Sequence, residues 1–398
     1  MRRVLVTIAV LAASAPALAQ SSDSPWEVSQ EAELAVIVAP GGSSSGDVER
    51  ENALYEIGLG LSGERILQSG WTIGGRAVFR ASRDHRDRPG GARNVLGADT
   101  QGIAGGFSRL SLGPVGGDTG PRGSLETAYL FVETGYGEFS LGRDTGIAAR
   151  FHEGDVSALS RGRLVDPYLD VSGIGAIDTR ANLTGPSTKA SYVTPRILGV
   201  RAGVSYTPRA DVRGLDRDST GAANPPRAEL ENAVEIGLNA SRRLRESGVR
   251  LRGGLSYSTA ELDAPAGFEG LFDDSLDVIA VGGEVEWQDT YRFGVNWLLA
   301  DEGLVSGGDY TAWSAGLGYE RGDWRASVVY GASEIDSIGA DSEGISLSLA
   351  REINDGFTLA VSWQDRDVTP LVPNSQSIGA RNAESDGFVV EITLAFKN

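Results

Sequence analysis

Charged side chains, rather than any nucleophile, are the residues of this chain most suited to a chemical role. The stretch 146–186 carries five carboxylates: Glu153, Asp155, Asp166, Asp170 and Asp178. Basic residues recur within segments that alternate between apolar and polar side chains: Arg76, Arg80, Lys189, Arg201, Arg250, Arg252, Arg292 and Arg325. Opposed rows of acidic and basic groups across a narrow, water-filled zone would order water and sort ions.

Catalysis and metal binding find little support in the sequence. There is no cysteine, and neither of the two histidines, His85 and His152, accompanies a nucleophile-elbow motif. The glycines at 58, 60 and 63 match a dinucleotide fingerprint, but they end an alternating segment without a following helix. Asp273-Asp274 offers oxygen ligands that suit Ca²⁺, yet no spacing supports a specific site. We expect no enzyme activity, no catalytic residue, no metal site and no cofactor.

The alternation predicts strands that carry these charges on one face. In residues 290–300, aromatic and aliphatic side chains alternate with Arg292, Gly294 and Asn296, and successive side chains of a strand point to opposite faces. The pattern predicts an all-β fold of about sixteen strands, at 27–38, 50–62, 70–81, 124–133, 137–145, 187–194, 199–207, 231–243, 248–259, 276–288, 290–300, 310–321, 323–333, 342–352, 355–365 and 386–396.

A transmembrane antiparallel barrel explains these strands better than a soluble sandwich. The strands are long enough to cross a bilayer at a tilt, and aromatic residues such as Trp71, Trp287 and Phe388 lie near their ends, where an interfacial girdle belongs. Tight turns alternate with long polar connections, as in barrels with short periplasmic turns and long outer loops. The basic residues named above would then point into the lumen.

Composition and the first residues agree with export to the outer membrane. Arg2-Arg3, an apolar run and Ala17-Leu18-Ala19 predict a signal peptide over 1–19, which leaves 20–398 as a single transmembrane barrel domain. No later stretch offers 18 consecutive apolar residues. The 54 glycines and 40% hydrophobic content fit strands with only one apolar face, and the formal net charge of −18 argues against nucleic acid.

Residues 124–207 resemble the general porin family of Gram-negative bacteria. The first part of the resemblance is Leu125-Glu126-Thr127-Ala128-Tyr129 followed by Gly135-Tyr136-Gly137-Glu138-Phe139-Ser140-Leu141-Gly142-Arg143. The second part is Arg180-x-Asn182, Ser191-Tyr192-Val193-Thr194-Pro195 and Leu198-Gly199-Val200. The chain departs from the family at its end, where Phe396 is followed by Lys397 and Asn398 instead of closing on an aromatic residue.

The resemblance implies a sixteen-stranded barrel, usually a homotrimer, whose long third loop folds into the lumen. The third long connection here is about 146–186, and Arg180 matches the arginine that follows this constriction loop in the family. We therefore expect two charged rows to face each other across the constriction: Glu153, Asp155 and Asp166 against Arg76, Arg80 and Arg180. Other basic side chains would line the lumen: Lys189, Arg201, Arg250 and Arg252.

The sequence thus predicts a porin in the outer membrane of a Gram-negative bacterium, a water-filled channel for passive diffusion of ions and small hydrophilic solutes. Its expected partners are outer-membrane lipid, these solutes and further copies of the chain. Two alternatives stay open: a substrate-selective channel of the same fold, and a secreted β-rich surface or adhesion protein. The acidic excess favours cations and the lumen arginines favour anions, so ion preference and solute identity are not decided.

Overall fold

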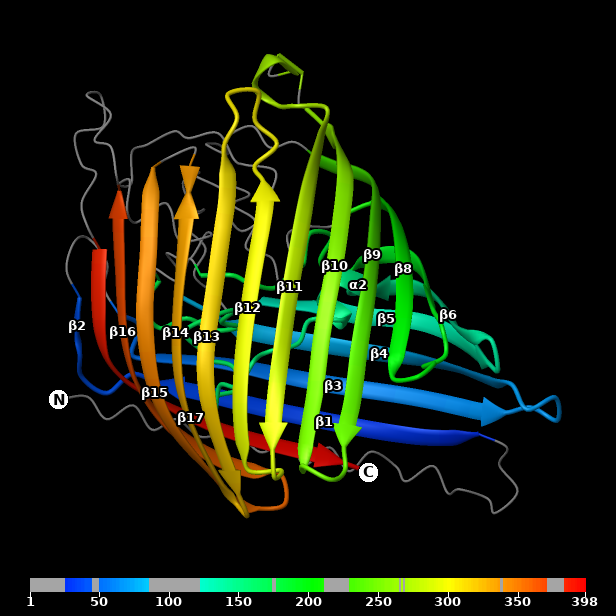
Figure 1. Ribbon diagram of the computed structural model, residues 1–398, viewed down its shortest axis with the longest axis horizontal. Helices are drawn as coiled ribbons and strands as arrows, with labels where there is room; N and C mark the ends of the chain where they lie inside the picture. Colours follow the sequence, from blue (N-terminus) through cyan, green and yellow to red (C-terminus); the bar gives the residue numbers. More distant parts are fainter. Residues whose placement is uncertain are drawn as a thin grey trace.

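The structure, a computed structural model, describes residues 26–44, 50–85, 122–173, 177–210, 229–264, 266–267, 269–336, 339–370 and 383–398. These residues form one closed antiparallel sheet of seventeen strands, one of them only two residues long (Figure 1). The strands are β1 (Glu27–Val38), β2 (Ser43–Ser44), β3 (Ala53–Ile66), β4 (Thr72–Arg83), β5 (Arg122–Thr134), β6 (Gly137–Asp144), β7 (Ser187–Val193), β8 (Val200–Arg209), β9 (Glu229–Leu244), β10 (Val249–Asp263), β11 (Ser275–Trp287), β12 (Tyr291–Asp301), β13 (Asp309–Arg321), β14 (Trp324–Ile335), β15 (Ala340–Asn354), β16 (Phe357–Pro370) and β17 (Ala383–Lys397).

The sixteen long strands confirm the predicted all-β barrel. Each predicted segment overlaps one of them, and the pairing of β1 with β17 closes the ring and leaves no free edge. Several strands run farther than predicted. β16 continues to Pro370, because Asp365, Arg366 and Asp367 still pair with β15, although all three are charged and the alternation of apolar and polar residues has ended. The signal peptide and most of the connection 84–121 fall outside the described residues.

The outer face of the barrel is apolar and the inner face is polar or closely packed. On β12, Tyr291 and Phe293 are 49% and 46% exposed, whereas Leu298 and Ala300 on the opposite face are fully buried. Aromatic rings contact one another near the strand ends, as Trp287 does with Tyr291 at 5.6 Å between centroids. A continuous exposed apolar band of this kind faces lipid. Within the part of the chain that the structure covers, no helix has the length and apolar character to cross a bilayer.

The connection between β6 and β7, residues 145–186, folds into the barrel, and we call it the inner loop (Figure 1). It begins with the single helical turn α2 (Ile147–Arg150), which contacts β8, β9 and β10. Farther along, the Ala158 N–H donates to the Ser327 hydroxyl of β14 at 2.9 Å, and the Ser160 N–H donates to Glu391 of β17 at 2.8 Å. The inner loop therefore follows the inside of the wall from β8 round to β17.

Eight consecutive strands, β8 to β15, each present at least one inward glycine to the inner loop. This glycine track comprises Gly203, Gly237, Gly254, Gly282, Gly294, Gly316, Gly331 and Gly344. Its members are direct partners across neighbouring strands in four places, for example Gly254 with Gly282. A Cβ added at Gly254 or Gly282 would lie 2.0 or 2.1 Å from a loop carbonyl oxygen. At Gly254, Gly282 and Gly294 the missing side chain thus allows the loop backbone to approach the strand backbone.

Alanine at Gly282 tests the glycine track directly. Its Cβ would meet the Glu153 carbonyl at 2.1 Å, whereas a Cβ at the neighbouring Gly283, on the outer face, would have its nearest atom at 3.7 Å. We expect Gly282→Ala to lower the free energy of unfolding by about 1–3 kcal/mol, as overpacking does, and Gly283→Ala to change it little. Urea unfolding of the folded barrel in detergent measures both. Equal effects would contradict the role of the track.

Candidate functional site

One carboxylate holds the tip of the inner loop. Glu391 of β17 is 3% exposed and accepts the backbone N–H groups of Ser160, Arg161 and Gly162 at 2.8, 2.9 and 2.8 Å. It also accepts the Ser160 hydroxyl at 2.6 Å. Hydrogen bonds to an ionised acceptor are about twice as strong as neutral ones, so this group fixes the far end of the inner loop against the wall.

Other buried acids anchor the rest of the inner loop. Glu235 of β9 accepts the Ala148 N–H at 3.1 Å and, through its other oxygen, the hydroxyl of Thr184. Asp170 forms a buried ion pair with Arg366 of β16, whose guanidinium also donates to the Arg163 carbonyl at 2.8 Å. These carboxylates are structural, because their oxygens already bind donors from the loop or from the wall that holds it.

A second ionic cluster joins the loop tip to the wall formed by β1, β3, β4 and β5. Arg80 contacts Glu56 at 2.5 Å and Glu126 at 2.6 Å, and Arg76 pairs with Glu31. From the loop, Arg161 reaches Glu33 and Glu56, each at 2.7 Å. The cluster therefore alternates acidic and basic groups across the boundary between loop and wall.

Three arginines of the inner loop surround one phenol ring. The guanidinium carbons of Arg161, Arg163 and Arg180 lie 5.0, 5.6 and 5.7 Å from the ring centroid of Tyr168, within the range of cation–π attraction. Arg180 donates to the Tyr168 hydroxyl at 2.7 Å, and Arg163 pairs with Asp155. The inner loop thus presents basic as well as acidic groups to the lumen.

The predicted constriction residues are arranged differently from the two facing rows expected from sequence. Asp166 and Arg180 belong to the same folded loop, where the Arg180 N–H donates to Asp166 at 3.0 Å. Glu153 accepts the Asn239 amide of β9 at 2.8 Å. The arginines at 76 and 80 contact wall acids, and Asp155 pairs within the loop. The structure therefore groups these residues into local pairs.

The other basic residues predicted for the lumen lie on the inner face of the wall. Lys189 is 2% exposed, and its ammonium donates to the Thr184 hydroxyl and the Gly185 carbonyl, both at 2.8 Å. Arg201 stacks on the ring of Phe151 at 4.9 Å. Three further arginines pair with Glu284 or Glu286 of β11: Arg250, Arg252 and Arg292.

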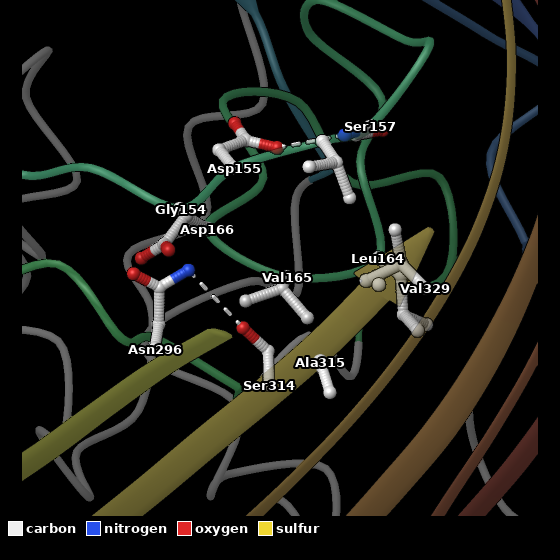
Figure 2. Close-up of a pocket in the computed structure, with 12 residues that line it drawn as sticks. Gly154, Asp155, Ser157, Leu164, Val165, Asp166, Asn296, Ser314, Ala315 and Val329 are labelled. Carbon is white, nitrogen blue, oxygen red and sulfur yellow. Dashed lines mark hydrogen bonds between the residues drawn. The ribbon is translucent and has the colours of Figure 1, made fainter. Parts of the chain in front are cut away.

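Little space remains between the inner loop and the wall at β12–β14. Figure 2 shows Asn296 and Ser314 of the wall beside Asp166 and Val165 of the loop, around a cavity of about 20 Å³. Such a volume suits a single water molecule. The Asn296 amide donates to Ser314 at 3.5 Å. Solutes therefore cannot pass between the loop and this side of the barrel.

The opposite side of the lumen, along β1 to β6, remains open to solvent. Inside the closed barrel, charged side chains of this wall keep substantial exposure, 45% for Arg76 and 39% for Glu31. On the inner loop, Asp155 is 31% exposed. Other partly exposed charged groups border the same space: Glu33, Glu126, Glu138, Arg150 and Arg163. We call this space, between the inner loop and the β1–β6 wall, the passage.

Sequence reasoning missed the groups that hold the inner loop. Glu391 lies between Val390 and Ile392 in the last strand. An acid at an inward position of a membrane strand indicates a functional or structural role, so the sequence could have identified Glu391 itself. Its partners lie 229 to 231 positions away, so the sequence does not reveal them. Among the described residues, no group of three or more His, Cys, Asp or Glu side chains could hold a metal ion.

Comparison with known proteins comes from a family profile and from solved structures. The profile described as Gram-negative porin matches residues 6–369, and no curated protein matches the chain. OmpF of Salmonella typhi, solved in complex with daunomycin, has a TM-score of 0.57 at 14% identity, covering 93% of this chain and 97% of its own. The anion-selective porin of Comamonas acidovorans has a TM-score of 0.54 at 13% identity, covering 93% and 99%.

A third similar structure is the trimer form of OmpT from Vibrio cholerae. It has a TM-score of 0.54 at 12% identity, and the match covers 93% of this chain and 99% of that one. Identities this low support a common fold and carry no information about solute or assembly.

Replacing the loop anchor tests its role. In Glu391→Gln the NH₂ of the new amide would face backbone N–H groups whose hydrogen bonds the carboxylate now accepts. A hydrogen bond to a charged group contributes about 1.5–3 kcal/mol, so we expect the loop tip to detach and protease cleavage within 145–173 to accelerate. Glu352→Gln, at an exposed position on β15, is the matched control. Equal cleavage in both variants would contradict the anchor.

The inner loop should lose stability in acid through His152. Burial lowers the pKa of His152 from 6.5 to about 4, against the opposing effect of Asp166 and with help from Arg180 and Arg163. The unfolded chain then binds a proton before the folded one, so stability is complete above about pH 6.5 and falls as the pH drops toward 4. Proteolysis between pH 7 and 4 should show this dependence, and His152→Gln should flatten it. An unchanged pH profile in that variant would exclude His152 as the origin.

Proposed function

We propose, from the premise that this chain belongs to the Gram-negative porin family, that ions and small hydrophilic solutes diffuse through the passage beside its inner loop. The protein is an outer-membrane channel for diffusion. One observation carries the route: the loop seals against β12–β14 with a cavity of about 20 Å³, whereas charged side chains on the β1–β6 side stay exposed. We assign the protein no catalytic activity and no cofactor.

The proposed mechanism is sorting by size and by a transverse electric field. Acidic groups gather on β1, β3, β5 and β6, with Glu31, Glu126 and Glu138 partly exposed. Basic groups lie on β8, β10 and β12 near the short turns, and the last three of them are more exposed than their acidic partners Glu284 and Glu286: Arg201, and the paired Arg250, Arg252 and Arg292. A field between the acidic and the basic groups favours polar solutes that can orient their dipoles over apolar solutes of equal size.

Within this mechanism the constriction comprises groups from both loop and wall. We assign direct contact with solutes to Asp155 and Arg163 of the loop and to Arg76, Arg80 and Glu31 of the wall, because these side chains border the passage. Two other residues of the expected rows act through the loop conformation: Glu153 and Asp166. Their hydrogen bonds to Asn239 and to the loop backbone support that role.

We further propose that the protein assembles as a homotrimer. The outer face of β3, β4 and β5 carries the small residues Gly63, Gly75, Ala77 and Ala128, which leave a hollow of about 480 Å³ edged by leucines. A second copy in the membrane plane could fill it with its own side chains. The trimer form of Vibrio cholerae OmpT is an example of such assembly on a similar fold.

Planar lipid bilayer recordings of the purified mature protein test both proposals. We expect stepwise, long-lived openings that occur in threes, because three barrels would insert together. The same protein after heat denaturation is the control. Absence of conductance from protein that circular dichroism shows to be folded β-sheet would contradict an open channel. Single, ungrouped steps together with a monomer mass in detergent would contradict the trimer alone.

A further inference from the structure

Most buried acids of the lumen are unavailable to a passing cation. Glu391, Glu235 and Asp166 are 3%, 1% and 7% exposed. Their oxygens accept hydrogen bonds from N–H groups or hydroxyls of the inner loop. A cation in the passage cannot contact these oxygens without breaking the anchors. The formal net charge of −18 is therefore a poor measure of the charge that a solute meets.

Two arginines inside the barrel, in contrast, have no carboxylate partner. Arg180 and Arg201 form no ion pair within 4.0 Å among the described residues, and the Nε of each is buried without a hydrogen-bond partner. Each instead stacks on an aromatic ring of the inner loop, Tyr168 for Arg180 and Phe151 for Arg201. Both side chains are partly exposed, so each offers a solute positive charge that no carboxylate contacts directly.

Arg180 belongs to a cluster with further donors for an anion. The Tyr168 ring brings Arg163 and Arg180 to one place, 5.6 and 5.7 Å from its centroid. Arg163 borders the passage with 17% of its side chain exposed, and Asp155 is its partner. Guanidinium groups match the planar geometry of carboxylate and phosphate oxygens with paired N–H donors.

We propose that Arg163, Tyr168 and Arg180 form a binding station for small oxyanions and that the channel therefore prefers anions. The proposal rests on the proposed function and names the solute class, small molecules bearing a phosphate or carboxylate. Between solutes, Asp155 holds Arg163. An arriving oxyanion replaces that carboxylate and is replaced by it again, so that binding stays weak enough for transport.

Reversal potentials under a KCl gradient and the effect of inorganic phosphate on chloride current test this proposal. The wild-type channel should be anion-selective, and millimolar phosphate should reduce its chloride current reversibly. Arg180→Gln should lower the chloride-to-potassium permeability ratio about sevenfold, since one unit charge about 7 Å away in water changes the energy of each ion by roughly RT, in opposite directions for chloride and potassium. It should also abolish the phosphate effect.

Two further variants separate the station from loop structure. Arg351→Gln is the matched control, because Arg351 also stacks on an aromatic ring, that of Trp324 at 5.1 Å, but on the outer face of β15. It should leave both measurements unchanged. Tyr168→Phe keeps the ring and removes the hydroxyl, so it should weaken the phosphate effect and preserve anion selectivity.

The possible outcomes distinguish a failure of the binding station from a failure of the channel function. A wild-type channel that conducts but selects cations, or whose chloride current ignores phosphate, overturns the station and leaves the channel function intact. Identical behaviour of Arg180→Gln and Arg351→Gln also overturns it. If Arg180→Gln does not fold, the two wild-type measurements and the Tyr168→Phe variant test the station instead. Absence of any conductance from folded wild-type protein contradicts the proposed function as well.

Discussion

A polypeptide segment inside a barrel must find hydrogen-bond partners for every backbone group that it buries, and this requirement determines how the lumen is built. Unpaired buried N–H and C=O groups cost about as much as a lost hydrogen bond. Over 145–173 and 177–186, the inner loop has almost no regular structure of its own beyond the single turn α2, so the wall has to supply partners. Side chains of β8, β9, β14 and β17 do so through Ser205, Glu235, Ser327 and Glu391.

Because these carboxylates bind donors of the inner loop, the net charge of the chain differs from the charge that a solute meets in the lumen. Acids that accept backbone N–H groups are held in place and buried, while the arginine side chains, which are longer, reach past them to aromatic rings or to the passage. Arg250, Arg252 and Arg292 show the same division, since they remain partly exposed while Glu284 and Glu286, their partners, are buried. Composition alone therefore cannot give the selectivity of such a channel.

The sequence predicts the barrel well, because each strand repeats a local rule. One apolar and one polar face, with a period of two residues, give all sixteen long strands and also the bounds of the inner loop to within a residue. The interior follows no local rule. Glu391 and Ser160 are 231 residues apart, and the glycine track becomes visible only when the register of eight strands is known. For the same reason Asp166 and Arg180, which sequence reasoning set opposite each other, are neighbours in one folded loop.

The route of the inner loop also limits its length. Between Phe151, which contacts Gly254 on β10, and Ser160, which is bound to β17, the loop spans seven strand spacings. At 4.7–4.9 Å each these amount to roughly 33 Å along the wall, whereas nine residues reach about 30–32 Å when fully extended. The segment also contains two short turns, where Asp155 and Ser157 accept N–H groups from residues two positions on, so it must follow an inner arc shorter than the wall itself. Surface loops usually tolerate insertions and deletions, but this one has little length to spare, so its residue count is tied to the circumference of the barrel.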